Sequence, residues 1–249
     1  MDNFIKLFFY IIIVNHIECR WSVIMENSSK IDIITGHFGS GKTEFSINYS
    51  IQLAKDNLKV ALVDLDIVNP FFRTAEVKDI LEEMGIKVIV PNFAGTTVDI
   101  PSLPADIYGV FEDKSYDKVI FDLGGDDLGA LALGRYHLEI EKMPYNMFYM
   151  INTKRPLSST QEQIIDMLKS IEGTSRLKVT YLINNTNLSY ETSLEDVMEG
   201  QSIIEKVSAE TNIPVAYVVA TDNIIEELPY DIKKKAFKLN LYMQPIWNK

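Results

Sequence analysis

The residues with the clearest chemical potential lie in the stretch ITGHFGSGKTEF, residues 34–45. Those that match the pattern G-x-x-x-x-G-K-[ST] are Gly36, His37, Phe38, Gly39, Ser40, Gly41, Lys42 and Thr43. The glycines of such a loop let backbone N–H groups converge on phosphate oxygens at the start of a helix, whose partial positive charge favours an anion. Lys42 would reach the outer phosphates, and the hydroxyl of Thr43 would bind Mg²⁺. We therefore predict nucleotide binding by residues 36–43 and by Glu44.

The segments on either side of this loop decide whether the pattern is meaningful, because a chain of this length matches it by chance about once in a hundred. Before the loop, residues 31–35 form a β-branched run that is typical of a strand. After it, residues 45–54 are mostly good helix formers with regularly spaced apolar residues. The phosphate-binding interpretation requires this strand and helix. The alternative is a glycine-rich strand-to-helix turn with an exposed lysine.

The rest of the chain alternates between short apolar runs and helical patterns. Strands are predicted at 31–35, 59–66, 86–91, 116–125, 145–153, 177–185 and 213–221. Further helices are predicted at 77–84, 158–171 and 194–210, with the serines at 158 and 159 starting the second of these. Nearly continuous apolar strands alternating with helices predict an α/β fold. We expect a doubly wound, mostly parallel sheet of about seven strands with helices on both faces.

Polar side chains follow three of these predicted strands. Asp64 and Asp66 end the second strand, Asp122 lies near the end of the fourth, and Asn184 and Asn185 end the sixth. In a parallel sheet, ligands bind beyond the carboxyl ends of the strands, where these residues would meet the phosphate loop. Mg²⁺ favours a few carboxylates together with water. We therefore assign Thr43, Asp64 and Asp122 to a magnesium site, with a helix cap or turn former as the alternative for each aspartate alone.

Composition limits the classes of function. The chain has 249 residues, of which 47% are apolar and 24% charged, as in a globular protein. Its net charge of −11 disfavours loose binding to nucleic acid, because the field of the whole protein repels phosphates. The single cysteine, Cys19, cannot form an intramolecular disulfide and is too little for an iron–sulfur site. A reducing, cytoplasmic location is therefore expected.

The first 24 residues differ from the rest. Their apolar core of about ten residues is short for a membrane span and has no convincing cleavage site. Residues from Met25 onward read as a natural beginning, MENSSKIDIITG. We interpret residues 1–24 as a dubious N-terminal extension and residues 25–249 as the nucleotide-binding domain. A membrane anchor and a genuine folded element are the alternatives.

Together these segments resemble the MinD/ParA-like (CobQ/CobB/MinD/ParA nucleotide-binding) family of P-loop NTPases. The similarity covers roughly residues 30–225 through the phosphate loop, the segment VDLDIVNPFFR, the segment DLGG and the strand end LINN. The resemblance implies binding and hydrolysis of ATP with Mg²⁺. It also implies a nucleotide-dependent homodimer, with hydrolysis coupled to dimer opening or to release of a partner protein.

The resemblance also implies roles for particular residues. Lys42 and Asp66 would be catalytic, with Asp66 orienting or deprotonating the attacking water. Gly125 would sense the γ-phosphate through its backbone N–H, and Asn184 and Asn185 would lie on the side of the base. Adenine is favoured, because the run NNTN lacks the lysine and aspartate of the guanine-specific motif N-K-x-D.

The chain departs from the family at the position of a signature lysine in the loop, where it has His37. An imidazole does not replace a permanent ammonium, so catalysis across a dimer loses its usual cation. Arg73 and Lys78 are the candidates to compensate. Adjacent aromatics in NPFFR, residues 69–73, either contact a partner or pack beneath the loop.

Two other classes of function remain open. An enzyme of small-molecule metabolism would use ATP to amidate or phosphorylate an acceptor, and its pocket would need convergent polar groups. The candidates for that pocket are Asp99, Asp126, Asp127 and Arg135. The second class is a nucleotide-binding module that does not hydrolyse.

The C-terminal stretch YDIKKKAFKLNLYMQPIW has apolar residues at helical spacing with lysines between them. The apolar positions are Ile232, Ala236, Leu239 and Met243. We expect a last helix that packs on its own domain, with a membrane-targeting tail as the alternative. Any contact with a membrane would be made through the termini.

Overall fold

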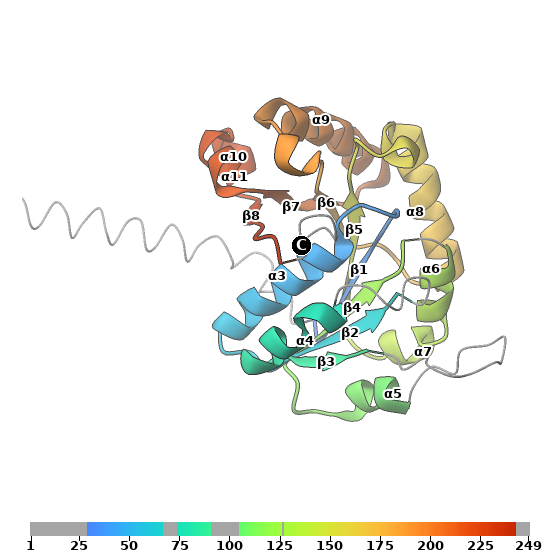
Figure 1. The fold of residues 1–249 in the computed structure, drawn as a ribbon. Coiled ribbons are helices and arrows are strands. Elements are labelled where there is room, and N and C mark those ends of the chain that lie inside the picture. The colour runs from blue at the N-terminus through green and yellow to red at the C-terminus, as the bar shows by residue number, and fades with distance from the viewer. Residues whose placement is uncertain (1–28, 67–73, 91–104, 126, 243–249) are drawn as a thin grey trace, which may run out of the picture.

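The computed structural model describes residues 29–66, 74–90, 105–125 and 127–242 (Figure 1). They form one sheet of eight parallel strands in the order β3-β2-β4-β1-β5-β6-β7-β8. The strands are β1 Ile31–Gly36, β2 Val60–Leu65, β3 Lys87–Ile89, β4 Lys118–Leu123, β5 Tyr145–Ile151, β6 Tyr181–Asn184, β7 Val215–Ala220 and β8 Ala236–Lys238. The predicted fold class is confirmed, with one strand more than expected.

Helices cover both faces of the sheet (Figure 1). They are α3 Lys42–Lys55, α4 Thr74–Glu83, α5 Ala105–Glu112, α6 Asp127–Gly134, α7 His137–Ile140, α8 Gln161–Ser175, α9 Leu194–Thr211, α10 Asp222–Glu227 and α11 Tyr230–Lys233. Short 3₁₀ turns lie at Pro156–Ser158 and Ser189–Glu191. None of the helices described is both long enough and apolar enough to pass through a bilayer.

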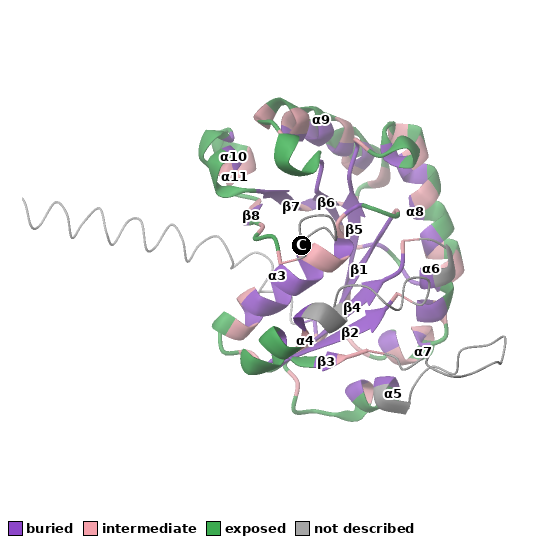
Figure 2. Ribbon diagram, viewed as in Figure 1, coloured by how far each residue is buried: buried purple, intermediate pink, exposed green. Residues whose placement is uncertain are grey.

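The strands are buried on both faces, which explains their nearly continuous apolar sequences (Figure 2). Successive residues of a strand point to opposite faces, so Ile33 packs in the core under α5, α6, α8 and α9, whereas Ile34 packs in the core under α3 and α4. Each face therefore has its own apolar layer. The sheet between them is a rigid base for the loops at its carboxyl edge.

The two long helices of the C-terminal half begin at capping boxes. Thr160 caps α8 with Gln163, and Ser193 caps α9 with Asp196. The sequence placed the start of α8 at residue 158, but Pro156–Ser158 forms a separate 3₁₀ turn first. The helix therefore begins later than predicted.

The prediction of a long C-terminal helix is wrong. Helix α11 ends at Lys233, and the chain then forms β8, which pairs in parallel with β7. In β8 the side chains alternate instead, since Phe237 is buried while Lys238 is exposed. The Phe237 ring lies 4.7 Å from the ring of Phe45, measured between centroids. Packing on α3 therefore selects the strand, while Met243 lies outside the described residues.

A buried polar cluster lies at the amino edge of the sheet, opposite the phosphate loop. The fully buried carboxylate of Asp32 accepts hydrogen bonds from Ser29, Tyr49, Lys118 and Asn146, at 2.9 to 3.1 Å. Burial, then the charge of Asp32, raises the pKa of Tyr49 well above its usual value. Because its hydrogen bonds are internal, this cluster joins the starts of β1, β4 and β5 and is structural.

Candidate functional site

The phosphate loop connects the end of β1 to the start of α3. Gly39 has φ of 74° and Gly41 has φ of 86°, values that favour glycine. Gly41 is the N-cap of α3, so the loop turns directly into the amino end of a helix of fourteen residues. The first N–H groups of the helix and its dipole meet there, which is the arrangement that binds phosphate.

Neighbouring segments lie very close to the loop at positions where glycine leaves room for them. A Cβ on Gly36 would collide with the backbone carbonyl of Met150 in β5, and one on Gly41 would collide with the amide of Asn185. A Cβ on Gly125 would lie 2.5 Å from the Cα of Phe38 and 3.0 Å from Nζ of Lys42. Gly125, which follows β4 in the DLGG segment, therefore approaches the phosphate loop closely because it has no side chain.

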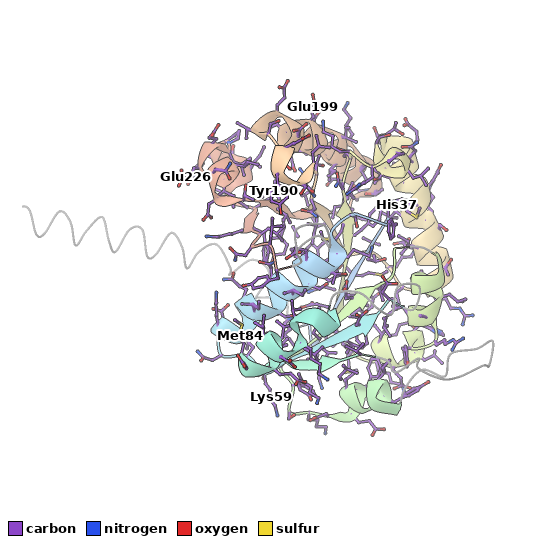
Figure 3. The ribbon with its side chains drawn as sticks, in the orientation of Figure 1. His37, Lys59, Met84, Tyr190, Glu199 and Glu226 are labelled. Atoms are coloured by element: carbon purple, nitrogen blue, oxygen red, sulfur yellow. The ribbon has the colours of Figure 1, made fainter. Side chains whose placement is uncertain are left out.

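Lys42 is buried, and its ammonium donates a hydrogen bond to the carbonyl of His37 at 3.2 Å. Its charge therefore lies along the outer half of the loop, residues 37–39. The His37 ring is half-buried, and its Nδ1 lies 2.9 Å from the carbonyl of Phe38 (Figure 3). Because a carbonyl only accepts, that nitrogen carries the hydrogen. Phe38 points outward and is 66% exposed.

Asp122 is buried at the end of β4, with its Cα opposite that of Asp64 in β2. Its Oδ1 accepts a hydrogen bond from Ser46 at 3.2 Å, and the Thr43 hydroxyl also donates to the carboxylate. Burial raises the pKa of Asp122 to about 6, and the charge of Asp66 contributes to the increase. Hydrogen bonds from Thr43 and Ser46 and the charge of Lys42 oppose the shift.

Two buried oxygens of the site have no hydrogen-bond partner within the described part of the chain. They are Oδ2 of Asp122 and the hydroxyl of Ser40. An orphaned carboxylate oxygen next to a threonine hydroxyl fits Mg²⁺, a hard cation that binds oxygen. In the described ranges, His, Cys, Asp and Glu side chains do not gather in groups of three or more that could hold a metal. A magnesium ion here would therefore need further ligands from water and nucleotide.

Of the other two aspartates, Asp64 lies in β2 and Asp66 directly follows that strand. The backbone N–H of Asp66 donates to Oδ1 of Asp64 at 2.9 Å. Oδ1 of Asp66 lies 3.1 Å from the position of a Cβ on Gly124, so this carboxylate lies beside the DLGG segment. The structure thus brings together the phosphate loop, all three aspartates and Gly125.

The two asparagines at the end of β6 make hydrogen bonds inside the protein. The amide of Asn185 donates to the carbonyl of Ser40 at 2.6 Å, which braces the loop. Asn184, the last residue of β6, is fully buried, donates to Val197 and Gln201, and accepts from the backbone of Thr186. Its amide is therefore occupied inside the protein, and a role on the side of the base stays a prediction.

Two features of the site were missed by sequence reasoning. Nε of Arg155 donates to the carbonyl of Gly39 at 3.1 Å, although the residues are 116 positions apart. At the other end of the loop, Glu44 accepts a hydrogen bond from the backbone of Tyr242 at 2.5 Å. The C-terminal segment thus lies along α3, where Asn48 also pairs with the backbone of Asn240. Long-range contacts of this kind leave no local pattern.

Other residues singled out from the sequence lie outside the described part of the chain or make their described contacts elsewhere. Residues 69–73, which include Arg73, lie outside the described residues, as do Asp99 and Asp126. Lys78 forms an ion pair with Glu82 at 3.8 Å along α4. Arg135 is exposed just after α6.

Replacing Gly125 tests its close approach to the loop. We expect Gly125→Ala to weaken binding of Mg-ATP at least about tenfold and to destabilise the protein by about 1–3 kcal/mol, because the new methyl group overlaps the Phe38 backbone. Gly173→Ala is the matched control, since its Cβ meets nothing within 4 Å and it lies in α8. The control should stabilise by up to about 1 kcal/mol and leave affinity unchanged. Calorimetry and urea unfolding measure both quantities, and equal behaviour of the two variants would contradict the contact.

The raised pKa of Asp122 predicts a pH-dependent stability of the ligand-free protein. A carboxyl whose pKa rises from 3.8 to about 6 on folding stabilises the fold while protonated and loses that contribution as pH rises through 6. Asp122→Asn should therefore raise the free energy of unfolding by about 1–3 kcal/mol at pH 8 and by much less at pH 4. The same variant should lose the effect of Mg²⁺ on nucleotide binding. A stability gain that is the same at both pH values would contradict this electrostatic account.

Comparison with known proteins agrees with this geometry. The family model of the CobQ/CobB/MinD/ParA nucleotide-binding domain matches residues 32–232. A search of curated proteins found no match.

Solved structures share the fold at low sequence identity. Cell division protein FtsY from Thermotoga maritima is 18% identical, with a TM-score of 0.56 over 83% of this chain and 66% of its own. The chain thus spans just under two thirds of that protein. A nucleotide-binding protein from Archaeoglobus fulgidus in complex with ADP is 13% identical, with a TM-score of 0.50 over 89% of this chain and 92% of its own. The matched family model covers the loop, both aspartate segments and the asparagine strand end, and so this chain belongs to the CobQ/CobB/MinD/ParA family of P-loop nucleotide-binding proteins.

Proposed function

We propose that this protein binds and hydrolyses ATP with Mg²⁺ and acts as a nucleotide-gated switch or assembly factor on a partner protein. The observation that carries the proposal is the close approach of Gly125 to the loop, because a Cβ on Gly125 would lie 2.5 Å from the Cα of Phe38 and 3.0 Å from Nζ of Lys42. A phosphate in the outer half of the loop would therefore lie close to the DLGG segment. A switch that responds to the terminal phosphate needs such a coupling.

The chain's own residues divide the work of binding. Loop N–H groups and Lys42 would hold the phosphates, while the Thr43 hydroxyl and the Asp122 carboxylate would hold the metal, with Asp64 beside them. Bound Mg²⁺ would neutralise charge on the phosphate oxygens. The orphaned oxygen of Asp122 supports this assignment, since its burial costs free energy that a cation would offset.

Hydrolysis would depend on Asp66. This half-buried carboxylate lies beside Gly124, at the end of the site where the DLGG segment meets the loop. There it would orient a water molecule and accept its proton. Lys42 would stabilise the negative charge that develops on the transferred phosphoryl group.

Adenine remains the proposed base. Guanine-specific sites use a carboxylate that accepts two hydrogen bonds from the base, whereas this chain has Asn187 in that run. The Asn187 amide donates to the carbonyl of Asn185 at 2.7 Å, and its oxygen accepts from the backbone of Ser189. An amide is uncharged, and this one already has hydrogen-bond partners inside the protein, so it is a poor substitute for a carboxylate at a guanine edge.

The partner would dock on the face that carries the loop. Phe38 is 66% exposed next to the phosphate site, and a second copy of this chain is the first candidate to cover it. The Archaeoglobus protein with bound ADP supports nucleotide binding by this fold. A nucleotide-dependent homodimer would let the state of the phosphates control the exposed face.

The proposal is tested by titrating the full chain with ATP and GTP, with and without Mg²⁺, while light scattering follows the mass. We expect binding of ATP that requires Mg²⁺, exceeds that of GTP, and doubles the mass. Lys42→Ala should abolish binding, because it removes the cation that meets the outer phosphates.

Asp66→Asn separates a hydrolysing switch from a binding module. This variant should bind Mg-ATP with unchanged affinity and lose turnover by about a hundredfold or more, since the amide accepts no proton. Wild-type protein that binds ATP but never turns it over would favour the module. Binding without any change in mass would count against the homodimer and favour a monomeric enzyme.

A further inference from the structure

Arg155 directs its guanidinium group onto the phosphate loop, although it belongs to the segment after β5. Its Nε donates to the carbonyl of Gly39 at 3.1 Å. A Cβ on Gly39 would lie 3.2 Å from Nε and 3.7 Å from Nη2. The edge of the guanidinium formed by these two nitrogens therefore faces the loop.

The backbone of Arg155 is held in a fixed turn. Its N–H donates to the carbonyl of Asn152 at 3.1 Å, and its own carbonyl accepts from the N–H of Ser158 at the same distance. Asn152 is fully buried, and its side-chain oxygen accepts from the N–H groups of Lys154 and Asn187. The side chain of Arg155 is exposed but starts from an ordered base. The fold therefore sets where the side chain starts, and the hydrogen bond to Gly39 directs it toward the loop.

The neighbouring cation points elsewhere. Lys154 forms ion pairs with Asp196 at 2.7 Å and with Glu199 at 3.0 Å, both on α9. Hydrogen bonds to these carboxylates raise the pKa of Lys154. Figure 3 shows Glu199 on α9, well apart from His37 in the loop. Lys154 therefore places its positive charge against α9, whereas the adjacent Arg155 places its charge against the phosphate loop.

The guanidinium group of Arg155 has more N–H donors than the one that the Gly39 carbonyl accepts. A guanidinium binds phosphate oxygens through two parallel N–H donors, whereas a single carbonyl oxygen is engaged here by Nε. Lys42 meets the carbonyl of His37 on the same half of the loop, which is the half where this lysine reaches the outer phosphates. A phosphate there would offer Arg155 a charge and a second acceptor.

We propose that Arg155 is a phosphate-binding residue that exchanges the Gly39 carbonyl for the terminal phosphate of a bound nucleoside triphosphate. The inference rests on the proposed function and adds to it a cation outside the sequence motif. It also accounts for His37 at the position of the signature lysine, because Arg155 supplies the permanent positive charge that an imidazole lacks. The residue would thereby discriminate a triphosphate from a diphosphate.

Arg155→Gln tests the proposal by calorimetric titration of the full chain with Mg-ADP and with the non-hydrolysable triphosphate Mg-AMPPNP. We expect the triphosphate to bind about 10- to 100-fold more weakly, with ADP affinity changed less than about threefold. Arg155→Lys should recover part of the loss, since it restores the charge without the fork. Lys154→Gln, at the next position, should leave the ratio of the two affinities unchanged.

The outcomes separate this inference from the function on which it rests. Wild-type protein that binds neither nucleotide would overturn both. Wild-type binding with an unchanged affinity ratio in Arg155→Gln would overturn only the role of Arg155. An equal loss for both nucleotides would show that Arg155 merely braces Gly39, which also contradicts the proposal.

Discussion

The parallel register of β1 between β4 and β5 is the constraint on which the site depends. It sets the end of β1 beside Met150 on one side and brings the segment after β4 to the phosphate loop on the other. These approaches are so close that the chain can meet them only with glycine at Gly36 and Gly125. The same register carries Asp122 under Thr43 and aims the turn after β5 at Gly39. One sheet geometry therefore positions the loop, the oxygens that we propose to bind metal, and the additional cation.

The electrostatics of the site are incomplete in the protein alone. Asp122 is buried with one oxygen unpartnered in the described chain, and its pKa is raised because burial outweighs the nearby hydrogen bonds and Lys42. Lys42 and Arg155 donate to carbonyls of the loop, at His37 and Gly39. Both cations are thus held close to the place where phosphate would bind. A metal nucleotide would satisfy the carboxylate and both cations together, so that binding and the conformation of the loop are coupled.

Much of this arrangement could be predicted from sequence because its signals are local. The loop pattern and the β-branched strands identify the fold, and the aspartates at strand ends identify the carboxylates that meet the loop. Arg155 could not be found in this way, because its partner is 116 positions away. The occupied amide of Asn184 and the strand at Phe237 escaped for the same reason, since tertiary packing decided them. The apolar spacing of residues 232, 236, 239 and 243 is helical, but tertiary packing of Phe237 on Phe45 overrides it.

The most direct test of the account is hydrogen–deuterium exchange of the full chain with and without Mg-ATP. Backbone amides of the phosphate loop and of the DLGG segment should both exchange at least about tenfold more slowly with nucleotide, because phosphate and metal would order the two segments together. Lys42→Ala should remove that protection. Protection of the loop without the DLGG segment would contradict their coupling. Unchanged exchange in both segments would contradict nucleotide binding at this site.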